Sequence, residues 1–100
     1  MRKDICTAID SKKVLSFYYN GGTRFVEPFC YGIHRSTDKE VLRGYQIGGY
    51  SESGESVGWK LFRVEEISKL MVTDRDFKGA REHYNPNDRV MKKIICRIAK

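Results

Sequence analysis

Long apolar runs are missing from this chain of 100 residues. The longest apolar stretches, such as Ile94-Ile95-Cys96, span only a few residues, whereas a helix needs about 20 apolar residues to cross a bilayer. The N-terminus is basic, but the apolar segment of a secretory signal does not follow it. We therefore expect no membrane partner, a cytoplasmic location and an unprocessed chain.

Cysteine is scarce, and the three that are present, Cys6, Cys30 and Cys96, are widely spaced. An odd number of cysteines without a secretory signal argues against a disulfide framework. The two histidines, His34 and His83, do not join them in the closely spaced ligand pairs that are typical of structural zinc sites. The spacing therefore predicts three reduced, buried thiols, with no metal and no cofactor.

The motifs of the common enzyme classes are also absent. The sequence has no nucleophile elbow, no P-loop, no dinucleotide-binding glycine motif before a helix and no H-E-x-x-H. Cys30 and His34 are four residues apart, which in a strand separates them by about 13 Å, far beyond hydrogen-bond reach. We therefore expect a binding or regulatory module rather than an enzyme.

The composition is that of one folded domain, with 40% apolar and 32% charged residues. The net charge is +6, and eight Lys or Arg against three acids lie between Arg75 and Lys100. A basic surface favours an anionic partner, either nucleic acid or a nucleotide, or an acidic protein. The alternative is that these charges only keep the surface solvated.

Two amphipathic stretches predict a helix near each end of the chain. Ile5, Ala8 and Ile9 follow helical spacing and predict a helix over residues 3–12. Asn85-Pro86-Asn87-Asp88 is typical of a helix start. The apolar residues after it fall on one helical face: Val90, Met91, Ile94, Ile95 and Ile98. We expect this face to pack on the barrel, with binding of phosphates or of a membrane surface by the basic helix as the alternative.

The middle of the chain is rich in β-forming residues. Asn20-Gly21-Gly22 is the strongest local signal, because Asn-Gly supplies the positive φ angles of a tight hairpin turn. Pro28 marks either a sheet edge or a bulge. Five short segments predict a small antiparallel barrel or sandwich: 14–19, 23–33, 41–50, 59–64 and 67–73.

Several of these segments together resemble the WYL domain family. The resemblance covers residues 5–77 and is carried by three runs: Ile5-x-x-Ala8-Ile9-x-x-Lys12-Lys13-Val14-Leu15-x-Phe17-x-Tyr19, then Arg24-x-Val26-x-Pro28, then Leu61-Phe62-Arg63-Val64-x-x-Ile67-x-x-Leu70 with Thr73 and Phe77. The Trp-Tyr-Leu triplet that names the family is replaced by Leu42-Arg43-Gly44-Tyr45-Gln46, in which only Tyr45 matches. Glu66 stands where family members often carry arginine.

The resemblance implies one domain over residues 1–100. A five-stranded Sm-like or SH3-like antiparallel barrel (14–74) would lie between the N-terminal helix (3–12) and a C-terminal extension with a helix (75–100). The family serves as an effector-sensing module, mainly in bacterial transcription regulators and defence proteins, with nucleic acid or nucleotide-like ligands. The usual helix-turn-helix is missing, so we expect no direct operator reading. The alternative is a protein-interaction module that binds an acidic protein or forms a homodimer.

We expect five residues to form one anion-binding face. The resemblance assigns Arg24, which precedes Val-x-Pro, and Arg63, which lies in the Phe-Arg strand. Charge and strand position assign Arg43 and Lys60, and Tyr45 shares the strand parity of Arg43. Lys60 lies at the margin because its parity differs from that of Arg63. Guanidinium groups bind phosphate bidentately and aromatic rings stack bases; the alternative is that the aromatic residues form the core and the arginines point outward.

Overall fold

A computed structural model describes residues 1–99; Lys100, the last residue of the expected C-terminal helix, lies outside the described residues. Over residues 1–99 the chain forms the following elements in order: α1 (Arg2–Ser11), β1 (Lys13–Tyr19), β2 (Gly22–His34), β3 (Glu40–Gly49), β4 (Gly58–Arg63), the 3-10 helix η1 (Val64–Glu66), β5 (Ser68–Asp76) and β6 (Met91–Arg97). No helix in this range is long and apolar enough to cross a membrane.

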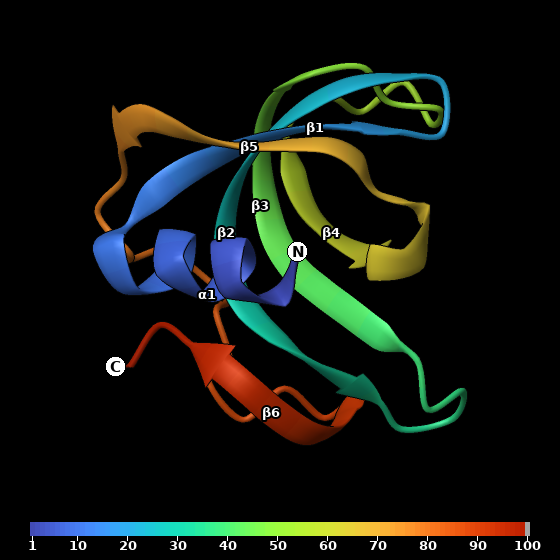
Figure 1. Cartoon of the computed structure of the whole chain (residues 1–100), viewed down its shortest axis with the longest axis vertical. Coiled ribbons are helices and arrows are strands. Elements are labelled where there is room, and N and C mark those ends of the chain that lie inside the picture. The colour runs from blue at the N-terminus through green and yellow to red at the C-terminus, as the bar shows by residue number, and fades with distance from the viewer. Residues whose placement is uncertain (100) are drawn as a thin grey trace.

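The six strands form one curved antiparallel sheet. Its order is β4-β3-β2-β1-β5, and β6 pairs with β2. Figure 1 shows β2 and β3 running through the middle of the molecule, β1 and β5 crossing at one end, β6 at the other end, and α1 in front of the sheet. The expected mainly β architecture is confirmed. The expected five-stranded barrel is not confirmed, because the sheet has a sixth strand and is not closed: among the described residues β4 pairs only with β3 and β5 only with β1.

The hairpin between β1 and β2 forms as the sequence predicts. Asn20 and Gly21 are the two loop residues between the strands, and both have positive φ angles, 39° and 105°. This geometry matches the twist of the flanking strands, and glycine adopts it without strain. The turn fixes the register in which Phe17 lies opposite Arg24.

β2 changes partner at Pro28. Residues 22–26 pair with β1, and residues 30–34 pair with β6. Pro28 lies in the gap between the two ladders, where its missing N–H leaves no hydrogen bond unmade. The register with β3 also shifts between Pro28 and Cys30, as it does at a bulge, which was one of the two predictions for Pro28.

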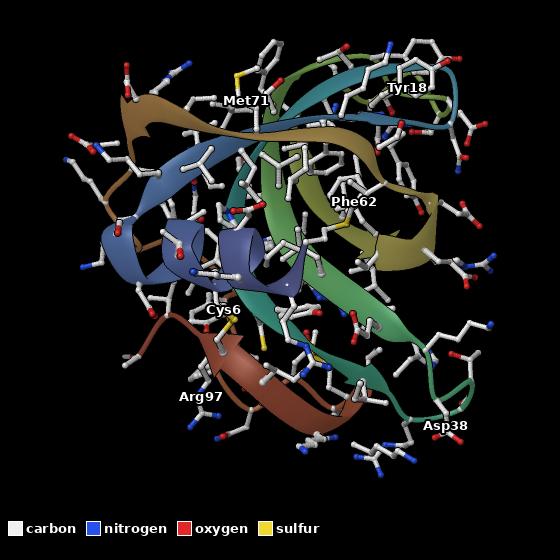
Figure 2. All side chains as sticks on the ribbon, viewed as in Figure 1. Cys6, Tyr18, Asp38, Phe62, Met71 and Arg97 are labelled. Atoms are coloured by element: carbon white, nitrogen blue, oxygen red, sulfur yellow. A yellow bond between two sulfur atoms is a disulfide. The ribbon has the colours of Figure 1, made fainter. Side chains whose placement is uncertain are left out.

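The core lies between the inner face of the curved sheet and α1. The rings of Phe17 and Phe62 contact each other edge to face, with 5.0 Å between their centroids. Figure 2 shows Phe62 pointing inward. Ile5, Ala8 and Ile9 are the buried residues of α1. The helix is therefore confirmed, shifted by one residue from the predicted range.

The expected C-terminal helix is wrong, because residues 91–97 form β6 instead. The side chains of Asn85 and Asp88 accept hydrogen bonds from backbone N–H groups two residues later, which makes turns rather than a helix cap. Ile94 and Ile95 are β-branched and fit a strand well. The second half of β2 offers an edge that needs a partner, and β6 pairs with it.

The expectation of three reduced thiols is also wrong. Cys6 of α1 and Cys96 of β6 form a disulfide, visible between these elements in Figure 2. The cysteines are 90 residues apart in the sequence, and the pairing of β6 with β2 brings them together. Cys30 is free and buried. Burial, and then the charge of Asp88, raise the pKa of its thiol to about 11.

Candidate anion-binding site

The structure divides the five predicted ligand residues between the two faces of the sheet. Directly opposite residues of antiparallel strands share a face. By this rule Arg43, Tyr45 and Arg63 lie on the outer face, and Arg24 and Lys60 on the inner face. The expected difference in parity between Lys60 and Arg63 is confirmed. The five side chains are not brought together on one face.

On the outer face, Arg43 and Tyr45 are engaged by the segment between β5 and β6. Arg43 donates to the Asp88 carboxylate at 2.8 and 3.4 Å. Burial raises the pKa of Asp88, but hydrogen bonds from Arg43 and the Val90 N–H lower it, and the pKa lies below its ordinary value. The Arg81 guanidinium lies 4.0 Å from the ring centre of Tyr45. Arg43 and Tyr45 therefore already have partners within the chain, a carboxylate for Arg43 and a cation for Tyr45.

Arg63 lies at the rim of a hollow of about 660 Å³. Its side chain is 67% exposed and its Nη1 lies 3.3 Å from the Glu66 carboxylate. Its backbone N–H donates to the Tyr19 hydroxyl at 3.0 Å. An exposed ion pair of this kind is easily exchanged with solvent and contributes little to stability.

Arg24 differs from the other predicted cations because it is buried, with 4% of the residue exposed. Three aromatic rings surround its guanidinium, at 5.2 Å for Tyr19, 5.5 Å for Tyr50 and 6.0 Å for Phe62. Cation–π attraction to such rings is worth about 0.5–2 kcal/mol each when the cation is desolvated. The rings therefore hold the cation in place without neutralising its charge.

The polar contacts of Arg24 are few and long. Nη1 donates to Gln46 Oε1 at 3.4 Å and Nη2 to the Asn20 carbonyl at 3.5 Å. Within residues 1–99 its buried Nε has no hydrogen-bond partner. None of the ion pairs formed within residues 1–99 involves Arg24. A buried charge without an opposite charge is costly, so an anion bound here would be stabilised.

Tyr50 is positioned by a close approach to the β1–β2 turn. A Cβ atom at Gly22 would lie 2.4 Å from the Tyr50 Cβ, and one at Gly21 would lie 2.8 Å from the ring. The absence of side chains at these two positions lets the ring lie against the turn and over Arg24. The turn that the sequence predicts therefore also helps to build the site.

A pocket of about 190 Å³ opens beside Arg24. Lys60 and the loop residues Ser51, Glu52 and Ser53 line its polar side. Lys60 Nζ donates to the Glu55 carbonyl at 2.7 Å and to Ser51 Oγ at 3.4 Å. An ammonium group has three donors, so one remains for a ligand. Two cations and two hydroxyl groups are the groups that commonly bind phosphate.

The sequence alone did not identify the loop residues of this pocket. Residues 51–56 read only as a polar loop, and their closeness to Arg24 depends on how β3 and β4 curve. The signal in the sequence that could have indicated the pocket is the three hydroxyl-bearing residues of this loop, which lie close in sequence to the strand residue Lys60. Over residues 1–99 no cluster of three or more His, Cys, Asp or Glu side chains could hold a metal ion.

Comparison with protein-family models, with curated proteins and with solved structures finds no match to this chain.

Proposed function

We propose that this protein is a regulatory module, not an enzyme, that binds a phosphate-bearing ligand such as a nucleotide or a single strand of nucleic acid. One observation carries the proposal: Arg24 is a buried cation with no ion pair within residues 1–99, and it lines a pocket together with Lys60. Arg63 lines the adjoining hollow, where it is paired with Glu66. Arg43 and Tyr45 take part only if Asp88 and Arg81 move away from them.

The strand order supports a relationship to small barrels. The order β4-β3-β2-β1-β5, with the short helix η1 between β4 and β5, fits an opened Sm-like or SH3-like barrel. Together with the WYL-like runs in the sequence, it favours an effector-sensing domain of a bacterial regulatory or defence system. A cytoplasmic location belongs to the same proposal; the Cys6–Cys96 disulfide would be unusual there, because cytosolic thiols are kept reduced.

The test is a fluorescence titration over a salt series with a labelled nucleotide and a labelled single-stranded oligonucleotide. Binding at low salt should weaken as salt rises, since phosphate contacts release counterions. Arg24→Gln should lower the affinity by about tenfold or more, because a charge-assisted hydrogen bond is worth about 1.5–3 kcal/mol. Arg75→Gln, at an exposed position of β5 that lines neither the pocket nor the hollow, is the matched control and should bind like the wild type.

A second candidate function, a protein-interaction module that forms a homodimer, is favoured by a row with exposed apolar side chains on the outer face. Met71, Ser16 and Phe25 lie opposite one another across β5, β1 and β2. Met71 is 62% exposed, and Figure 2 shows it on the outer side together with Tyr18. Lys69 lies over the Tyr18 ring at 5.9 Å and gives the row a positive rim.

Sedimentation and titration together separate the two functions. A dimer that Phe25→Ser dissociates, without any binding of phosphate compounds, would favour the interaction surface. A monomer whose phosphate binding depends on Arg24 would favour the ligand module.

A further inference from the structure

The pocket at Arg24 and the wide hollow at Arg63 adjoin each other. Tyr19, Glu52 and Leu61 line both. Their volumes are about 190 Å³ and about 660 Å³. Small-molecule sites generally span about 300–1,000 Å³. The narrow pocket therefore has room for one chemical group, and the wide hollow has room for the body of a ligand.

The narrow pocket is positive. Arg24 and Lys60 face it, and Glu52 at the shared wall is its single carboxylate among the residues that line it. The guanidinium of Arg24 has no carboxylate partner within the described chain, and its Nε is buried without a hydrogen bond. One anionic group of limited size would compensate this charge.

In the wide hollow, negatively charged groups outnumber positively charged ones. The two Lys and Arg side chains that line it are already paired, Lys39 with Glu65 at 3.3 Å and Arg63 with Glu66 at 3.3 Å. With Glu52, three carboxylates stand against two cations in this hollow. A second anionic group there would meet like charge, whereas hydroxyl groups would find carboxylate acceptors.

We infer that the ligand is a phosphomonoester, with one terminal phosphate between Arg24 and Lys60 and an uncharged, hydroxyl-bearing body in the wide hollow. Ribonucleoside monophosphates and sugar phosphates share this chemistry. The inference rests on the proposed function and narrows it, because a polyphosphate or a continuing nucleic-acid strand would place further phosphates against the carboxylates. Glu52, at the wall between the two spaces, accepts a hydroxyl of the body next to the phosphate.

Calorimetry at low salt with a panel of probes tests the ligand class. AMP and ribose 5-phosphate should bind about tenfold or more tightly than ATP or a short oligothymidylate without a terminal phosphate. Adenosine and ribose should not bind measurably, because they lack the phosphate. If AMP binds and ribose 5-phosphate does not, the body is a nucleoside; equal binding of the two points to the sugar phosphate alone.

Variants test the two halves of the site separately. Arg24→Gln and Lys60→Met should each weaken AMP binding by about tenfold or more, and Lys60→Met keeps the test valid if the buried Arg24 variant does not fold. Glu52→Gln should lower the affinity for AMP, because the amide is a weaker hydroxyl acceptor than the carboxylate. It should raise the affinity for ATP, because a charge that repels the additional phosphates is removed. Glu55→Gln, in the same loop but outside the lining of both spaces, is the matched control and should change neither.

Each outcome bears on a different claim. ATP or the oligothymidylate binding more tightly than AMP, with the same dependence on Arg24, overturns the phosphomonoester inference and leaves the proposed function standing. No binding of any phosphate compound that depends on Arg24 or Lys60 overturns both. The expected order of affinities, together with the opposite effects of Glu52→Gln on AMP and ATP, supports the inference.

Discussion

Arg81 and Glu27 form a bidentate ion pair, with Nε 2.9 Å from Oε1 and Nη2 3.0 Å from Oε2. Glu27 is buried on the outer face of β2, and its hydrogen bonds raise the pKa of Arg81 further above its ordinary value. Because the same guanidinium stacks on Tyr45, one side chain from the segment after β5 binds to both β2 and β3.

Replacing Arg81 should therefore destabilise the fold. Arg81→Ala leaves the Glu27 carboxylate buried without a partner, which should cost about 1–3 kcal/mol, less than for a fully buried pair because the Arg81 side chain is 37% exposed. Urea denaturation measures the free energy of unfolding. Arg63→Ala is the control and should cost less than about 0.5 kcal/mol. Equal effects of the two substitutions would contradict the stabilising role of the Glu27 pair.

The β2–β6 ladder can be tested through Gly32. A Cβ atom there would lie 2.2 Å from the Lys93 carbonyl oxygen, a backbone atom that cannot move without disrupting the ladder. Gly32→Ala should lower the free energy of unfolding by about 1–3 kcal/mol. Gly48→Ala is the matched control in the neighbouring strand, since no atom lies within 4 Å of its Cβ position, and it should be neutral within about 0.5 kcal/mol. A neutral Gly32→Ala would argue against β6 as a strand.

Thiol counting tests the disulfide. Denatured protein without reductant should show one reactive thiol, Cys30, and three after reduction. The native protein should react very slowly, because Cys30 is buried and its pKa is raised to about 11. Cys6→Ser should lower stability by about 2–5 kcal/mol under oxidising conditions and far less under reducing ones. Three reactive thiols in the unreduced, denatured protein would show that the bond does not form in solution.

The stability of the fold should depend on pH through Glu40. Hydrogen bonds from the Tyr31 hydroxyl, at 2.5 Å, and from Arg2, at 2.7 Å, hold the pKa of Glu40 below its ordinary value of 4.5. A lowered pKa in the folded state stabilises the protein above the unfolded pKa, and this contribution is lost as the pH falls through the folded pKa. The stability difference between wild type and Glu40→Gln should therefore be largest near neutral pH.

Urea denaturation of both proteins between about pH 7 and pH 3 measures this difference. We expect it to shrink as the pH falls below 4.5. A difference that stays constant over this range would mean that the Tyr31 and Arg2 contacts do not favour the ionised carboxylate.

Parts of the candidate site could be predicted and parts could not. Arg24 and Lys60 were expected from charge, strand position and resemblance, and both line the narrow pocket. The parity argument placed Arg43 with Tyr45 correctly, but it did not show which face of β3 lies outward. That choice depends on the curvature of the whole sheet and on Asp88, which lies 45 residues from Arg43 in the sequence.

The sequence alone determined the elements that depend only on neighbouring residues. These are α1, the Asn20-Gly21 turn and the five strand segments, which follow from side-chain periodicity and backbone φ preferences. The tertiary structure decided the rest. The Ile94-Ile95 segment fits either a helix or a strand, and the free edge of β2 selected the strand. The same pairing brought Cys96 to Cys6, across 90 residues. The burial of Arg24 depends on rings from β1, β4 and Tyr50, and contacts between such distant segments leave no signal in a local pattern.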